Sequence, residues 1–340
     1  MHSITLDLFP ASTFAVDNMP PKPSFTSCFP CIVRSDQDSI AENVIKYFIE
    51  NWSWKTPDDF TKLAGQGLEL WTGFAFPTAL KDRIECASML SVVGFIMDDI
   101  LETYHHDKTK QFLSRLRGLI LGTTHPTADN QVEFVFADIH AHIRDTDKTD
   151  PFRLGNKYCE TTFQWITAYL NQERSNASVQ NTLESYAGYR FTDVGVWWAF
   201  ALMEWACNLP VPEHIACDPN FHALQHKAGM HGLLANDLYS YRREVLQASR
   251  TSSNTIKPKL VNSISVVMVE HNLDEEEATE YIKTRLTDVE VSFLEMEGSW
   301  KLKYSGDDLA FLEKYSLATK CMIAGNLWWS VSCGRYNQIQ

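Results

Sequence analysis

The feature that most constrains the fold is a polar stretch of nine residues, 236–244, with the sequence NDLYSYRRE. Asn236, Ser240 and Glu244 recur at every fourth position, so an α-helix would place their side chains on one face. Amide, hydroxyl and carboxylate oxygens are hard ligands that suit Mg²⁺ better than zinc. The stretch therefore predicts a helix that either holds a magnesium ion or presents an ordinary polar face to solvent.

A second acidic stretch lies upstream, where residues 98–102 read DDILE and end an apolar run over residues 89–97. Two adjacent carboxylates are costly to bury unless a cation neutralises them, although a helix that surfaces at Asp98 would simply leave them solvated. Two such faces in one chain favour a joint site. The ligand they could share is a diphosphate, because proteins usually hold Mg²⁺ with few carboxylates plus substrate phosphates.

These two stretches resemble the aspartate-rich and NSE motifs of class I terpene synthases, and most closely those of fungal sesquiterpene cyclases of the aristolochene synthase type. The resemblance also includes YRFTDVG at residues 189–195, GNLWW at 325–329 and the pair Arg335-Tyr336, and it extends from about residue 39 to residue 336. It implies an enzyme that ionises farnesyl diphosphate with the help of Mg²⁺, cyclises the carbocation to a sesquiterpene and releases diphosphate.

The resemblance also implies roles for polar residues. Three Mg²⁺ ions would be held on the substrate diphosphate by Asp98, Asn236, Ser240 and Glu244, with Asp99 and Glu102 as weaker candidates. Arg190, Arg243, Arg335 and Tyr336 would bind the diphosphate, and Arg190, Arg335 and Tyr336 would be catalytic. Taken singly, each arginine could equally form a surface ion pair. The aristolochene-type pattern has lysine where this chain has Arg243, and Asp193 would link Arg190 to a helix break near Val194.

Four aromatic residues are candidates for the wall of a cavity that would hold the carbocation. Phe95 and Trp329 match lining positions of the family, and Phe74 and Trp165 are further candidates. Aromatic faces attract cations through their quadrupole, and a dry cavity prevents water from quenching the intermediate. Each of the four could instead be an ordinary core residue.

Composition limits the classes of function. With 44% hydrophobic and 21% charged residues, the chain can bury a large core. A net charge of −13 argues against nucleic acid as a partner. We expect no membrane span, because no apolar run approaches the ~20 residues that a bilayer requires. The single CxxC at Cys28 and Cys31 has no second copy and does not favour zinc or redox chemistry. We expect a cytoplasmic protein, and the sequence leaves assembly into a homo-oligomer open.

The hydrophobic periodicity favours an all-α fold. We expect an irregular arm over residues 1–38 and one class I terpene cyclase domain over 39–340, a helical bundle of ten or more helices around a central apolar cavity. Helices are expected at 40–52, from 57 onward, at 77–102, 111–121, 131–143 and 152–170, at 181–207 with a break at Gly195, at 221–247 and 260–271, from 272–277 onward, and from the Asp307-Asp308 cap to 329.

Three other functions stay open from the sequence. A diterpene cyclase that acts on geranylgeranyl diphosphate would carry the same motifs. A chain-elongating prenyl diphosphate synthase shares the fold, but it would have a second aspartate-rich motif where this chain has NDLYSYRRE. A helical protein that only binds prenyl diphosphates would lack turnover altogether.

Overall fold

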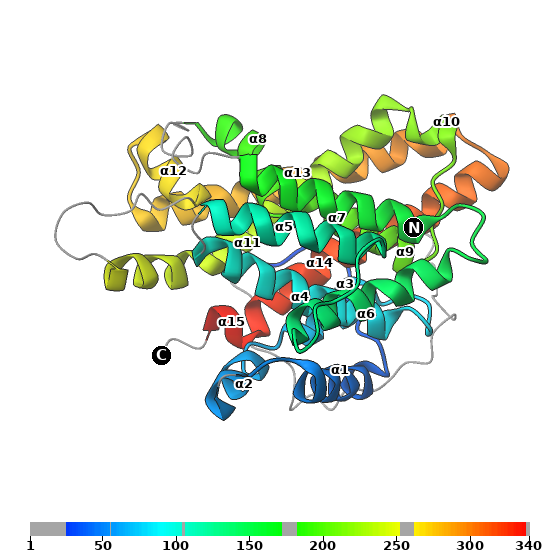
Figure 1. Ribbon diagram of the computed structural model, residues 1–340. Helices are drawn as coiled ribbons and strands as arrows, with labels where there is room; N and C mark the ends of the chain where they lie inside the picture. Colours follow the sequence, from blue (N-terminus) through cyan, green and yellow to red (C-terminus); the bar gives the residue numbers. More distant parts are fainter. Residues whose placement is uncertain (1–24, 55, 104–105, 172–181, 252–261, 338–340) are drawn as a thin grey trace.

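The computed structural model describes residues 25–54, 56–103, 106–171, 182–251 and 262–337, and every regular element in these ranges is a helix (Figure 1). Within them, the side chains of residues 57–58, 98–103, 106–111, 168–171, 189, 193, 247–251 and 301 lie outside the described part. The prediction of an all-α fold is confirmed. The helices are α1 (Gln37–Asn51), α2 (Pro57–Ala64), the 3₁₀ helix η2 (Leu68–Leu70), α3 (Trp71–Ala75), α4 (Ile84–Thr103), α5 (His106–Leu121), α6 (Gln131–Thr146), α7 (Leu154–Asn171), α8 (Leu183–Asp193), α9 (Val196–Ala206), α10 (Glu213–Ala216), α11 (Pro219–Thr251), α12 (Ser263–His271), α13 (Glu275–Lys303), α14 (Gly306–Ser332) and α15 (Gly334–Asn337).

Helix α11, which carries residues 236–244, lies at the centre of the packing. It contacts α8, α9, α10, α12, α13, α14 and α15, while α14 packs in turn against α3. Figure 1 shows α14 passing through the middle of the bundle, behind α5 and α7. Because so many helices meet α11, residues distant in sequence can converge on its polar face.

The predicted break at Gly195 separates α8 from α9. Gly195 has φ 73°, a left-handed conformation that favours glycine, and it is the N-cap of α9. A Cβ at this position would lie 3.4 Å from Nε1 of Trp165 on α7. The break therefore lies beside one of the aromatic residues expected in the cavity wall.

The helix expected over residues 77–102 starts later than predicted, at Ile84. The segment before it satisfies its backbone groups with distant partners instead of a helical ladder. Leu80 N donates to Ala206 O at 2.9 Å, and Arg34 Nη1 donates to Pro77 O at 3.2 Å and to Ala79 O at 2.7 Å. These contacts stabilise residues 77–83 in an irregular conformation, which the spacing of apolar residues does not predict.

Other helix bounds differ by a few residues. Helix α1 begins at Gln37 with Asp36 as N-cap, before the expected start, and α5 begins at His106 instead of residue 111. The N-cap of α14 is Ser305, so Asp307 and Asp308 lie in the first turn of the helix. Their negative charges stabilise the helix there through a favourable interaction with its dipole. The acidic start of α13 is confirmed, with a capping box between Asp274 and Glu277.

Part of the N-terminal arm packs against the body. Phe25 and Phe29 are buried, and Cys28 N donates to Glu290 Oε2 on α13 at 2.8 Å. Residues 1–24 and 252–261 lie outside the described part of the chain. Among the helices of the described ranges, none is both long enough and apolar enough to cross a membrane.

Candidate active site

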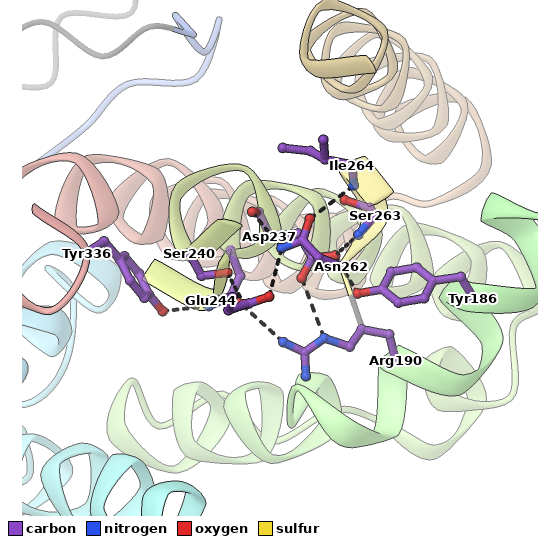
Figure 2. Close-up of polar contacts among 10 residues, drawn as sticks. Tyr186, Arg190, Asp237, Ser240, Glu244, Asn262, Ser263, Ile264 and Tyr336 are labelled. Atoms are coloured by element: carbon purple, nitrogen blue, oxygen red, sulfur yellow. Dashed lines mark hydrogen bonds and ion pairs between the residues drawn. The ribbon is translucent and has the colours of Figure 1, made fainter. Parts of the chain in front are cut away.

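The polar face of α11 gathers the residues that the sequence motif singled out. Ser240 Oγ donates to Glu244 Oε1 at 2.5 Å, one turn further along the helix. Asn236 Nδ2 donates to Tyr336 Oη at 2.8 Å, and Asn236 Oδ1 accepts from Arg190 Nη2 at 3.3 Å. Figure 2 shows Arg190 on α8 and Tyr336 on α15 reaching this face from opposite sides. The structure thus brings three predicted ligands together with two predicted diphosphate-binding residues.

Asp237 organises the same region, although sequence reasoning missed it. Its carboxylate is completely buried. Oδ2 accepts hydrogen bonds from Tyr186 Oη at 2.6 Å and from Ser263 N at 2.9 Å, and Oδ1 lies 3.5 Å from Arg190 Nε (Figure 2). Asp237 therefore joins α8 to the start of α12 and holds the guanidinium of Arg190 beside Asn236.

Asn262 makes a second connection between α11 and α12. It is buried and serves as the N-cap of α12, where its Oδ1 accepts from Ile264 N at 3.0 Å. Its Nδ2 lies 2.9 Å from Asp237 O and 3.3 Å from Glu244 Oε2 (Figure 2). The capping residue of one helix thereby orients the carboxylate of Glu244.

The carboxylates of α11 are in an environment that disfavours their charge. Burial and, to a smaller extent, the nearby charge of Asp237 together raise the pKa of Glu244 to about 7. Burial also raises the pKa of Asp237, against the opposing effect of Arg190. A bound cation would offset this cost, and the amide, hydroxyl and carboxylate oxygens on this face are suitable donors for Mg²⁺.

A second group of residues lies where α14 and α15 meet α4. The rings of Phe95 and Trp329 stack with centroids 5.2 Å apart, and Trp329 meets Tyr336 edge-on at 5.6 Å. Arg335 Cζ lies 5.1 Å from the centroid of Phe95. Phe95 is partly exposed, whereas only 1% of Trp329 is exposed. The predicted wall residues and diphosphate-binding residues are therefore neighbours here.

An aromatic cluster lies beside the break between α8 and α9. Trp198 packs on Trp165 at 5.8 Å and on Trp71 at 6.4 Å, and its Nε1 donates to Tyr158 Oη at 3.0 Å. Sequence analysis assigned no role to Trp198. Phe74 lies on α3, whose backbone comes so close to α14 that a Cβ on Gly325 would be 2.2 Å from Phe74 O.

For most of the remaining predicted residues, the structure describes the position of the backbone but not the side chain. Asp98, Asp99 and Glu102 lie on α4 and Asp193 ends α8, but their side chains are outside the described part. Arg243 is partly buried on α11. Among the described side chains, no group of three or more His, Cys, Asp or Glu residues is placed to hold a metal. The expected ligand set instead combines an amide and a hydroxyl with carboxylates.

Comparison with known proteins identifies the family. Residues 90–290, more than half of the chain, match the model for terpene synthase family 2, C-terminal metal binding. The chain belongs to this family. It is accordingly a class I terpene synthase, an enzyme of the lyase class.

Individual relatives of this terpene synthase differ in length and product. An aristolochene synthase of Aspergillus terreus is 24% identical over 94% of this chain and 95% of its own length. A sesterterpene synthase of Colletotrichum orbiculare is 23% identical over 92% of this chain but only 44% of its own length. The crystal structure of aristolochene synthase from Penicillium roqueforti shares the fold with a TM-score of 0.76, at 23% identity over 92% of this chain and 99% of that one.

Proposed function

We propose that this terpene synthase is a Mg²⁺-dependent sesquiterpene cyclase that ionises farnesyl diphosphate and closes the carbocation to a cyclic hydrocarbon. The observation that carries the proposal is the convergence of Arg190, Asn236 and Tyr336 through hydrogen bonds of 3.3 and 2.8 Å. A metal-ligand face and two hydrogen-bond donors to an anion meet at one point. This is the pairing that departure of a diphosphate requires.

The ligands of Mg²⁺ in this proposal are Asn236, Ser240 and Glu244 on α11, with Asp98 on α4. Mg²⁺ would neutralise the charge that develops on the leaving diphosphate. The donors fit the ion, because Ser240 Oγ and Glu244 Oε1 lie 2.5 Å apart on one helix face. Burial raises the pKa of Glu244, and a bound cation would offset this cost of keeping the carboxylate charged. Asp99 and Glu102 are weaker candidates, and three ions are expected from the resemblance.

Arg190, Arg335 and Tyr336 would bind the diphosphate oxygens, with Arg243 in support. Each guanidinium offers several N–H donors in a fixed plane that suits phosphate oxygens. Before substrate arrives, Asp237 orients Arg190. Tyr336 likewise orients Asn236. Donors fixed in advance stabilise the developing charge without a cost of reorganisation during the reaction.

The hydrocarbon chain would extend toward the aromatic residues. Phe95 is partly exposed beside Arg335, and Trp165 packs against Trp198 at the helix break. Phe74 and Trp329 complete the proposed wall. Aromatic faces at these positions would attract the migrating positive charge and exclude water.

A fifteen-carbon substrate is supported by the aristolochene synthase of Aspergillus terreus, which this chain matches along nearly the whole length of both proteins. The sesterterpene synthase relative and a bifunctional type I diterpene synthase of Aspergillus flavipes leave geranylgeranyl diphosphate as the second candidate substrate. The chain covers 44% and 36% of these two relatives, which are much longer.

Incubation with geranyl, farnesyl and geranylgeranyl diphosphate in Mg²⁺, followed by gas chromatography and mass spectrometry, tests the proposal. We expect farnesyl diphosphate to give the highest kcat/KM and a cyclic sesquiterpene. A cyclic diterpene at higher kcat/KM would replace the proposal with a diterpene cyclase. Condensation of two substrates into a longer diphosphate would indicate a chain-elongating synthase.

A further inference from the structure

The turn between α2 and η2 reaches the far end of the chain. It has the sequence Gly65-Gln66-Gly67, and Gly67 has φ 68°, which favours glycine. A Cβ on Gly67 would lie 3.9 Å from Cys333 Cα and 4.0 Å from Gly334 N. The backbone of this turn therefore lies directly against the junction of α14 and α15, next to Arg335.

Gln66 contacts Arg335 twice. Its carbonyl oxygen accepts from Arg335 N at 3.1 Å, and its side-chain Oε1 accepts from Arg335 Nη1 at 2.8 Å. The neighbouring Gly67 O accepts from Trp329 Nε1 at 2.7 Å. One short turn thus fixes the backbone and the guanidinium of Arg335 and also the indole that packs beside Tyr336.

We propose that Gln66 is a positioning residue that orients the Arg335 guanidinium for diphosphate binding. The inference rests on the proposed function, because it assumes that Arg335 meets the diphosphate. Only 7% of Arg335 is exposed, and its guanidinium contacts both Gln66 and the ring of Phe95. These two contacts restrict the direction of the side chain.

The chemistry of the amide is suited to this role. A guanidinium has five N–H donors, and the Oε1 of Gln66 accepts from one nitrogen without adding a negative charge. A carboxylate at position 66 would accept the same hydrogen bond, but it would pair with the guanidinium and repel an incoming diphosphate. Glutamine can therefore orient the arginine and leave its charge available to the substrate.

Two nearly isosteric variants separate these effects. Gln66→Met keeps the size of the side chain and removes the acceptor, whereas Gln66→Glu keeps the acceptor and adds a charge. Gln131→Ala, at the exposed start of α6, is a control for loss of a glutamine. For all variants and Arg335→Ala we would measure kcat and KM with farnesyl diphosphate, circular dichroism, and calorimetric binding of inorganic diphosphate with Mg²⁺.

We expect Gln66→Met to lower kcat about tenfold with a smaller change in KM, because the misdirected arginine affects ionisation more than binding. Gln66→Glu should raise KM and the Kd for diphosphate about tenfold or more. Gln66→Met added to Arg335→Ala should cause no further loss, since the two residues act through one contact. Kinetic constants of both Gln66 variants within about twofold of the wild type, with Arg335→Ala impaired, would overturn the positioning role.

The calorimetry distinguishes failure of this inference from failure of the proposed function. If the wild type binds diphosphate but turns over no prenyl diphosphate, the proposed function fails. In that case a higher Kd for diphosphate in Gln66→Glu than in Gln66→Met still supports the positioning role. Equal Kd values for the two variants and the wild type contradict it. A wild-type protein that does not bind diphosphate with Mg²⁺ overturns both.

Discussion

Asp237 links the polar site to the stability of the protein. It is completely buried, and its partners come from α8 and from the start of α12. Removing one member of a buried ion pair leaves the other charge without compensation, which typically costs about 3–5 kcal/mol. The carboxylate therefore has both a structural role and a role in orienting Arg190.

We expect Asp237→Ala to lower the free energy of unfolding by about 3 kcal/mol or more and to reduce turnover as well. Urea denaturation and steady-state kinetics would measure the two effects. Glu313→Ala removes an exposed carboxylate on α14 and should change neither quantity appreciably. An Asp237→Ala protein as stable as the wild type would show that the pair with Arg190 contributes little.

Phe95 and Trp329 should respond differently to substitution, although both are predicted wall residues. Trp329 is buried and donates a hydrogen bond to Gly67 O. Trp329→Leu should therefore lower the free energy of unfolding by nearly the ~3–5 kcal/mol typical of truncating a large buried aromatic.

Phe95 is partly exposed beside Arg335. Loss of its cation–π attraction, worth about 0.5–2 kcal/mol, should redirect the product mixture in Phe95→Leu. Thermal melting and product profiling together test this, and an unchanged profile in Phe95→Leu would make Phe95 a core residue.

The residues that sequence analysis found and missed differ in how far apart their partners lie. Asn236, Ser240 and Glu244 share a helix, so their common face follows from spacing alone. Asn262 lies 25 positions after Asp237, and Gln66 lies 269 positions before Arg335. Such pairs depend on tertiary packing, and a single sequence contains no local pattern that indicates them.

At the scale of helices, the connection between α5 and α6 depends on one buried carboxylate. Glu133, in the first turn of α6, accepts from Arg115 Nη2 on α5 at 2.7 Å and from Thr127 N at 2.7 Å. The hydrogen bonds from Arg115 lower the pKa of Glu133 to about 2, although burial acts in the opposite direction. The ionised form of Glu133 thus fastens the loop before α6.

This shift predicts an acid-labile connection. The folded pKa lies below the ordinary value of 4.5, so the unfolded chain binds the proton more tightly. The stabilisation is fully present above about pH 4.5 and is lost as the pH falls toward 2. We expect the melting temperature to fall over this range and Glu133→Gln to reduce the dependence. The same slope in both proteins would contradict the assignment.

The limits of sequence analysis for helices have a physical cause. Periodic apolar positions located the long helices to within a few residues, and capping residues located the start of α13. The segment at 77–83 has helical spacing but stays irregular, because Arg34 and the end of α9 supply partners for its backbone. Tertiary contacts of this kind override local propensity.

At the scale of the whole molecule, part of the N-terminal arm packs into the core of the helical bundle. Phe29 is 5% exposed and packs on Phe293 of α13 with ring centroids 5.4 Å apart. Residues 25–36 therefore contribute to the hydrophobic core. The boundary of the cyclase domain proposed at residue 39 can be tested through them.

We expect Phe29→Ala to lower the free energy of unfolding by about 3–5 kcal/mol, as for a core phenylalanine. Phe152→Ala is the matched control, since Phe152 is 63% exposed, and it should have little effect. Denaturant unfolding of the two variants gives the comparison. Equal stabilities would place residues 25–36 outside the cooperative unit.

The arrangement of the whole bundle was predictable only as a class. Helical periodicity and the absence of strand patterns gave an all-α fold, and the motif resemblance predicts that the polar faces of α4 and α11 form one site. The central place of α11 arises from its contacts with seven other helices. Periodicity shows that a helix has an apolar face but does not identify which helices cover it.

The most direct test of the account is the release of diphosphate from farnesyl diphosphate with and without Mg²⁺, by the wild type, Asn236→Ala and Glu244→Ala. We predict release that requires Mg²⁺ in the wild type and falls by about 10²–10³ in each variant, the loss typical of removing one stabilising group from such a site. Melting temperatures near that of the wild type would confirm that the variants are folded. Release that persists without a divalent cation, or that is unchanged in either variant, would contradict the assignment of this face of α11 as the metal site.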